Sequence, residues 1–90
     1  MSVLSARLSF YISHASSLKD KRQVCRGLID KARRIFNASI AEVDTQEFCQ
    51  TLTIGIAVIS GDMAHAQQSL DEIIRFMDEY ADAELIEIVI

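Results

Sequence analysis

The feature that most constrains the fold is a change of hydrophobic period that occurs twice along the chain. Each time, a segment with the two-residue period of a strand leads into one with the 3.6-residue period of a helix, and another strand-like segment follows. The sequence therefore predicts the order β-α-β-β-α-β. Ninety residues, half of them hydrophobic, supply one core and not two, so we expect a single domain over residues 1–90.

The first three elements follow from residue types and spacing. Apolar and polar residues alternate from Leu4 to Ile12, which predicts a half-buried strand. Ser16 or Ser17 supplies a helix N-cap, and Asn37 suggests a left-handed helix end, with a short strand from Ser39 to Val43 beyond it. The apolar stripe of this helix consists of Leu18, Cys25, Leu28, Ile29, Ala32, Ile35 and Phe36.

The second half of the chain repeats the pattern. A polar turn at residues 44–47 precedes a β-rich run from Cys49 to Ser60, and these two strands should pair as a hairpin. Ser60-Gly61-Asp62 then supplies a turn and an N-cap, and Glu84 to Ile90 closes the chain as a strand. The apolar stripe of the intervening helix is Met63, Ala66, Leu70, Ile73, Ile74, Met77 and Ala81.

Two right-handed β-α-β units joined by a hairpin predict a ferredoxin-like α+β sandwich. The first and third strands should be central in a four-stranded antiparallel sheet, with both helices on one face. The other face should be open to water or to a second copy of the chain. The residues expected on it are Ser5, Arg7, Ser9, Tyr11, Thr51, Thr53, Ala57, Ile59, Leu85, Glu87 and Val89.

Three stretches resemble the bacterial YlxP-like proteins, a domain of unknown function called DUF503. They are residues 17–22 leading into 28–30, residues 36–44, and residues 55–60. The resemblance covers the whole chain and implies a ferredoxin-like fold. It also implies a translation-linked role, because genes of this family often lie among translation and ribosome-maturation genes. Thr45 and Cys49 depart from the family pattern, which argues against a chemical role for the turn.

Charge is distributed very unevenly. The formal net charge of −4 and the pI near 5.0 argue weakly against a general nucleic-acid binder. Residues 19–34, however, hold seven of the nine basic residues beside two aspartates, a net charge of +5, and the rest of the chain carries −9. The first helix is thus the candidate surface for RNA, the ribosome or another anionic partner.

Within this helix, four cations should lie in a band about 60° wide beside the apolar stripe. The predicted anion-binding residues are Lys19, Lys21, Arg22, Arg26, Arg33 and Arg34. Lys19 and Lys21 occupy the first turn, where the helix dipole disfavours cations, and this placement favours a binding role. The alternative is a solvated helix face balanced by acidic neighbours.

The open sheet face is the second candidate surface, for a homodimer or a protein partner, with Arg7, Tyr11, Thr53 and Ile59 as its interaction residues. Tyr11 is the only aromatic residue expected there. RNA-recognition motifs stack bases on two or three aromatic side chains, so that mode of RNA binding is not predicted.

No catalytic, metal or cofactor site is predicted, and no small-molecule substrate is identified. The carboxylates around Glu42 and Asp44 match no calcium loop, and His14 and His65 have no partner at ligand spacing. Cys25 should be packed as a small hydrophobe, and Cys49 partly exposed.

With no signal peptide, no apolar run of membrane-spanning length and only two separated cysteines, we expect a cytoplasmic protein without a membrane partner. The leading hypothesis is a non-enzymatic binding protein.

Overall fold

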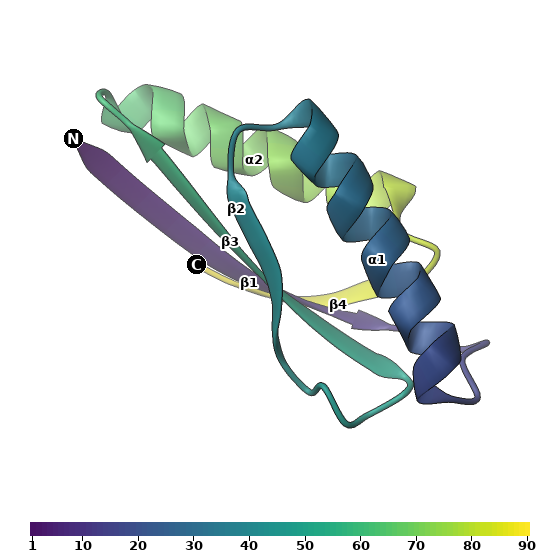
Figure 1. The fold of residues 1–90 in the computed structure, drawn as a ribbon. Helices are drawn as coiled ribbons and strands as arrows, with labels where there is room; N and C mark the ends of the chain where they lie inside the picture. Colours follow the sequence, from purple (N-terminus) through teal and green to yellow (C-terminus); the bar gives the residue numbers. More distant parts are fainter.

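The computed structural model describes all 90 residues and has the predicted element order. The strands form one antiparallel sheet in the order β2-β3-β1-β4, and Figure 1 shows α1 and α2 on the same side of it. This is the expected ferredoxin-like α+β fold. No helix is long and apolar enough to span a membrane. The elements are β1 (Ser2–Tyr11), α1 (Leu18–Ile35), β2 (Ser39–Asp44), β3 (Thr51–Ser60), α2 (Met63–Tyr80) and β4 (Glu84–Val89).

The two central strands position everything else. β1 and β3 pair over their full length, from Ser2 opposite Ser60 to Tyr11 opposite Thr51. Because side chains alternate along a strand, one face of this ladder is apolar and is covered by both helices. The core between the sheet and the helices includes Leu8, Phe10, Leu28, Leu52, Ile54, Ile56, Leu70, Ile73 and Met77.

The start of α1 agrees with the prediction and its end does not. Ser17 is the N-cap, and its hydroxyl accepts a hydrogen bond from the backbone N–H of Asp20 at 3.2 Å. The helix ends in extended backbone at Phe36, whose ring packs edge-on against Phe76, and Asn37 has no positive φ. The left-handed helix end predicted at Asn37 is therefore wrong. The backbone is already extended at Phe36, and β2 begins three residues later, at Ser39.

At the start of α2, Asp62 is the N-cap residue, but its side chain makes no capping hydrogen bond. The hydroxyl of Ser60 instead accepts a hydrogen bond from the N–H of Asp62 at 3.2 Å. The predicted turn is thus in place, with the serine rather than the aspartate supplying the local side-chain contact.

A bulge in β4 corrects one assignment. Leu85 lies opposite Phe10 and packs against the core, whereas the sequence placed it on the open face. The pairing shifts between Ser9 and Phe10, so the extra residue, Ile86, lies on the open side together with Glu87. Strict alternation fails here because a bulge adds one residue to one strand of the pair.

A second irregularity, between Glu42 and Asp44, shapes the open face near β2. A Cβ atom on Gly55 would lie 2.7 Å from Cγ1 of Val43, so only glycine leaves room for this valine over β3. The loop that follows β2 contains the one non-glycine residue with positive φ, Thr45 at 57°. This loop folds back toward α1.

Candidate functional site

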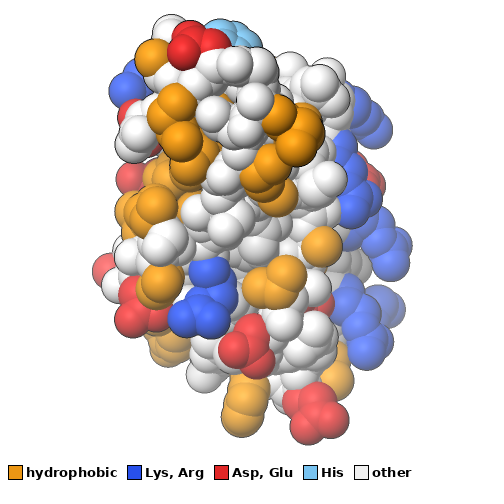
Figure 2. Space-filling model, turned by 90° about the vertical axis from the view of Figure 1, so that its left-hand side faces the viewer, with side chains coloured by type: hydrophobic (Ala, Val, Ile, Leu, Met, Phe, Trp, Pro, Cys, Tyr) orange, Lys and Arg blue, Asp and Glu red, His pale blue; other side chains and the backbone are white.

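The exposed side of α1 carries the chain's main concentration of positive charge. One face of the helix is buried on the core through Cys25, Leu28 and Ala32. The remaining cations of residues 19–34 are exposed, apart from Lys21. In the view of Figure 2, basic side chains gather along the right-hand edge of the molecule, and apolar side chains are scattered across the middle.

We define the basic ridge as Lys19, Arg22, Arg26 and Arg33. All four are exposed, and none forms an ion pair, since the only lysine or arginine that lies within ion-pair distance of a carboxylate is Lys21, beside Glu42. At 1.5 Å per residue the ridge is about 21 Å long. These charges are therefore available to an external anion.

The C-terminal end of the ridge is anchored. Nη2 of Arg33 donates a hydrogen bond to the carbonyl oxygen of Ile40 at 2.5 Å, which ties α1 to the edge strand β2. Arg34 is exposed in the same last turn, where a cation interacts favourably with the helix dipole. Its direction at 100° per residue places Arg34 off the ridge, on a neighbouring side of the helix.

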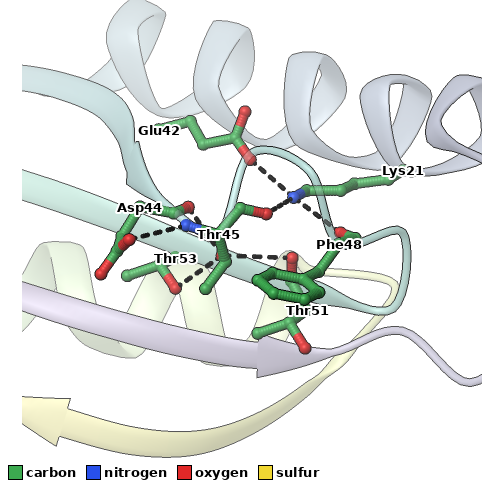
Figure 3. A network of polar contacts seen from close by, with 7 residues as sticks. All are labelled: Lys21, Glu42, Asp44, Thr45, Phe48, Thr51 and Thr53. Carbon is green, nitrogen blue, oxygen red and sulfur yellow. Dashed lines mark hydrogen bonds and ion pairs between the residues drawn. The ribbon is translucent and has the colours of Figure 1, made fainter.

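Lys21 is not part of any binding surface, which corrects its assignment to the anion-binding set. The residue is 1% exposed, and Figure 3 shows its side chain reaching from α1 into the loop after β2. Nζ lies 2.8 Å from Oε2 of Glu42 and donates to the carbonyl oxygens of Phe48, at 2.8 Å, and Thr45. These three acceptors offset the unfavourable interaction of a cation with the helix dipole in the first turn. The position of Lys21 is therefore explained by its role in the fold and not by a binding role.

The sequence did contain a signal for this burial. Lys21 lies three residues after Leu18, four before Cys25 and seven before Leu28, which is the spacing of the buried stripe itself. A lysine within an apolar stripe needs an acceptor in the interior, because a buried ammonium without partners is very unfavourable. What the sequence could not reveal is that Glu42 and two loop carbonyls supply the acceptors.

The same loop covers Thr53, which corrects a second predicted site residue. Thr53 is on the open side of β3 but only 3% exposed, and its hydroxyl lies 2.9 Å from that of Thr45. The Thr45 hydroxyl also donates to the carbonyl of Asp44 at 2.6 Å (Figure 3). Thr53 therefore contributes to the folding of the loop and is not available to a partner.

The N-terminus of α1, where the ridge begins, is held by Asp20. Its Oδ2 accepts hydrogen bonds from the backbone N–H and the hydroxyl of Ser16, each at 3.0 Å. The backbone hydrogen bond from Ser16, followed by the hydroxyl bond, lowers the pKa of the Asp20 carboxyl below its usual value. The negative charge of Asp20 also suits the positive end of the helix dipole.

The two histidines make local contacts. His14 is exposed, with Nε2 3.1 Å from Oδ2 of Asp82, and His65 lies with Nδ1 3.2 Å from the hydroxyl of Ser60. No group of three or more histidine, cysteine or acidic side chains is placed to hold a metal ion. The Ser60 hydroxyl that contacts His65 also accepts the N–H of Asp62 at the start of α2.

The cysteines are both free thiols, and each lies where it was expected. Cys25 is buried on the core side of α1, and burial raises the pKa of its thiol above the usual value. Cys49 is half-buried in the loop before β3. The two residues differ in environment, so they should differ in reactivity.

On the open face, the other predicted interaction residues are accessible. Arg7 is exposed near the middle of β1, and Tyr11 and Ile59 are 40% and 60% exposed. The face combines these side chains with small ones, including Ser5 and Ala57. The face is therefore a mixed surface of apolar, small and charged side chains, the charged ones being Arg7, Asp44, Glu84 and Glu87.

The fold and the ridge together define a small ferredoxin-like domain with one cationic helix. The sequence matches, over residues 3–90, the family described as "Protein of unknown function (DUF503)", and the chain belongs to this family. It is similar to "Uncharacterized protein YlxP" of Bacillus subtilis (strain 168), with 32% identity over 73 residues. The aligned part is 81% of this chain and 79% of the relative.

Proposed function

We propose that this protein is a non-enzymatic RNA-binding protein of the cytoplasm and that the basic ridge contacts the phosphates of its RNA partner. The observation that carries the proposal is that the four ridge cations are exposed and form no ion pair, with only Arg33 donating a hydrogen bond to a backbone carbonyl, while the chain outside residues 19–34 carries a net charge of −9. Exposed cations on an otherwise negatively charged protein favour the orientation in which the basic ridge faces a polyanion such as RNA.

Several features support this binding mode over others. Tyr11 is the only aromatic side chain of the sheet's open face, so stacking on the sheet is disfavoured and phosphate contact is favoured. The translation-linked context of the family resemblance favours structured RNA, ribosomal RNA included. The two free thiols suit a reducing compartment such as the cytoplasm.

The salt dependence of RNA binding tests the proposal. Four phosphate contacts give a slope of log affinity against log salt near −3, since each contact contributes about −0.7 to −0.9. The probe is a fluorescent RNA stem-loop with single-stranded flanks, and binding is measured by anisotropy in increasing KCl. A slope near zero, or absence of binding at low salt, would overturn the proposal.

A matched pair of double variants separates the ridge from net charge. Arg22→Ala with Arg26→Ala removes two ridge cations, and Lys31→Ala with Arg75→Ala removes two exposed cations off the ridge. Both pairs lower the net charge equally. We expect the ridge pair to reduce the slope by about 1.5 and the control pair to leave it nearly unchanged. Equal effects of both pairs would show that binding follows overall charge and not the ridge.

A further inference from the structure

The open face of the sheet carries an apolar surface that no element of the chain covers. Of the thirteen large hydrophobic residues that are exposed, six lie on this side. They are Val3, Tyr11, Val43, Ile59, Ile86 and Val89. Exposed apolar side chains that gather on one face of a protein often mark an interaction surface.

The centre of this face is lined mainly by small side chains, with Val43 lying over Gly55. Ser5, Ala57 and Ser39 lie side by side across β1, β3 and β2, and Arg7 is next to Gly55 and Ala41 in the following row. Small side chains let a second sheet approach, as in sandwiches of two packed sheets. Val3 and Ile59, directly opposite each other, form an apolar rim at one end.

The face carries one cation, Arg7, and three carboxylates, Asp44, Glu84 and Glu87, so a second copy can offer each Arg7 an acidic partner. Arg7 is on β1 and Glu87 lies on the neighbouring β4, opposite Ser9. Both are exposed, and neither forms an ion pair within the chain. A two-fold axis between two such faces can bring Arg7 of one copy to Glu87 of the other, twice, because a two-fold interface uses the same surface on both copies.

We propose that the open face is a homodimer interface, with a second copy of this chain packed face to face and reciprocal Arg7–Glu87 pairs. Two faces of roughly 500 Å² each bury about 1,000 Å² together, below the roughly 1,200 Å² at which standard specific interfaces begin. The dimer is therefore weak and forms at micromolar and higher concentrations. It leaves the basic ridge free, because α1 is on the opposite side of the sheet, so this inference is independent of RNA binding.

Sedimentation equilibrium over a range of concentrations tests the dimer itself. The wild-type chain should change from monomer to dimer between about 5 and 500 µM. Ile59→Asp, on the face, should remain monomeric, whereas Ile35→Asp, on an exposed isoleucine at the end of α1, should dimerise as the wild type does. A wild-type chain that is strictly monomeric at 500 µM overturns the proposal, as does a dimer that survives Ile59→Asp.

Charge reversal tests the reciprocal pairing. Arg7→Glu alone and Glu87→Arg alone place like charges opposite each other in the homodimer, so each should associate at least severalfold more weakly than the wild type. An equimolar mixture of the two variants should recover the association, because every pair across the mixed interface is then opposite in charge. If the mixture associates no better than either variant alone, the face-to-face pairing is wrong. A dimer that forms through the edge strands β2 or β4 would show no such recovery in the mixture.

Discussion

Replacing Lys21 with methionine tests the buried network that joins α1 to the loop after β2. The change keeps most of the apolar stem and removes the ammonium. Glu42 then loses its cation, and the carbonyl oxygens of Thr45 and Phe48 lose the donor that reaches them from the helix. Because Lys21 is 1% exposed, water cannot simply take the place of its ammonium at this point.

The contacts set the size of the effect. A buried carbonyl without a donor costs about 1 to 3 kcal/mol, and breaking a buried ion pair from one side costs about 3 to 5 kcal/mol. The Glu42 side chain is 23% exposed as a whole, although Oε2, which pairs with Lys21, is buried, so we expect a total of at least about 3 to 5 kcal/mol. For a domain of this size 1 kcal/mol lowers Tm by roughly 4 to 8 °C, so Tm should fall by at least about 12 °C.

Urea and thermal unfolding followed by circular dichroism measure this loss of stability. Lys19→Met is the matched control, because Lys19 is exposed two residues earlier in the same helix, and it should change stability by less than about 0.5 kcal/mol. Equal stabilities for the Lys21 and Lys19 variants would refute the structural role assigned to the buried lysine.

Two further predictions concern Asp20 and the cysteines. The lowered pKa of Asp20 means that its stabilisation is present above about pH 4 and is lost as the pH falls through the folded-state pKa. Asp20→Asn should therefore lower Tm at pH 7 and reduce the fall of Tm between pH 4 and 2. The control, Asp78→Asn at an exposed position of α2, should leave the plot of Tm against pH unchanged. Parallel plots for Asp20→Asn and the wild type would contradict this prediction. Iodoacetamide at pH 8 should alkylate Cys49 well before Cys25, whose buried thiol has a raised pKa, and mass spectrometry should detect Cys25 modification at a comparable rate only in denaturant. Equal rates in the native protein would contradict the burial of Cys25.

Most of the fold could be predicted from the sequence because its strands and helices have clear periods. β1 and β3 alternate over ten residues, and this alternation predicts which side chains of each strand face the core, although it does not set the register of their ladder. Leu85 was misplaced because a bulge changes the face of a side chain without changing the sequence pattern around it. Asn37 was misread because a residue that tolerates positive φ does not require it.

The site could be predicted only in part, for a different reason. Exposed cations such as Arg22 and Arg26 follow from their helical direction alone, since water is their default surrounding. Lys21 and Thr53 depend on the path of the loop after β2, and that path is set by tertiary contacts. Lys21 reaches Thr45 and Phe48, 24 and 27 positions away, and Thr45 reaches Thr53, 8 positions away. Helical and strand periods contain no information about such contacts.

The most direct test of the central claim, that the basic ridge contacts RNA, is a titration of the isotope-labelled protein with the RNA stem-loop, followed by amide NMR spectra. We predict that the largest shifts fall on α1 around Arg22 and Arg26, with little change at Arg7 on the open face. Shifts centred on the open face, with α1 unaffected at saturating RNA, would contradict the account.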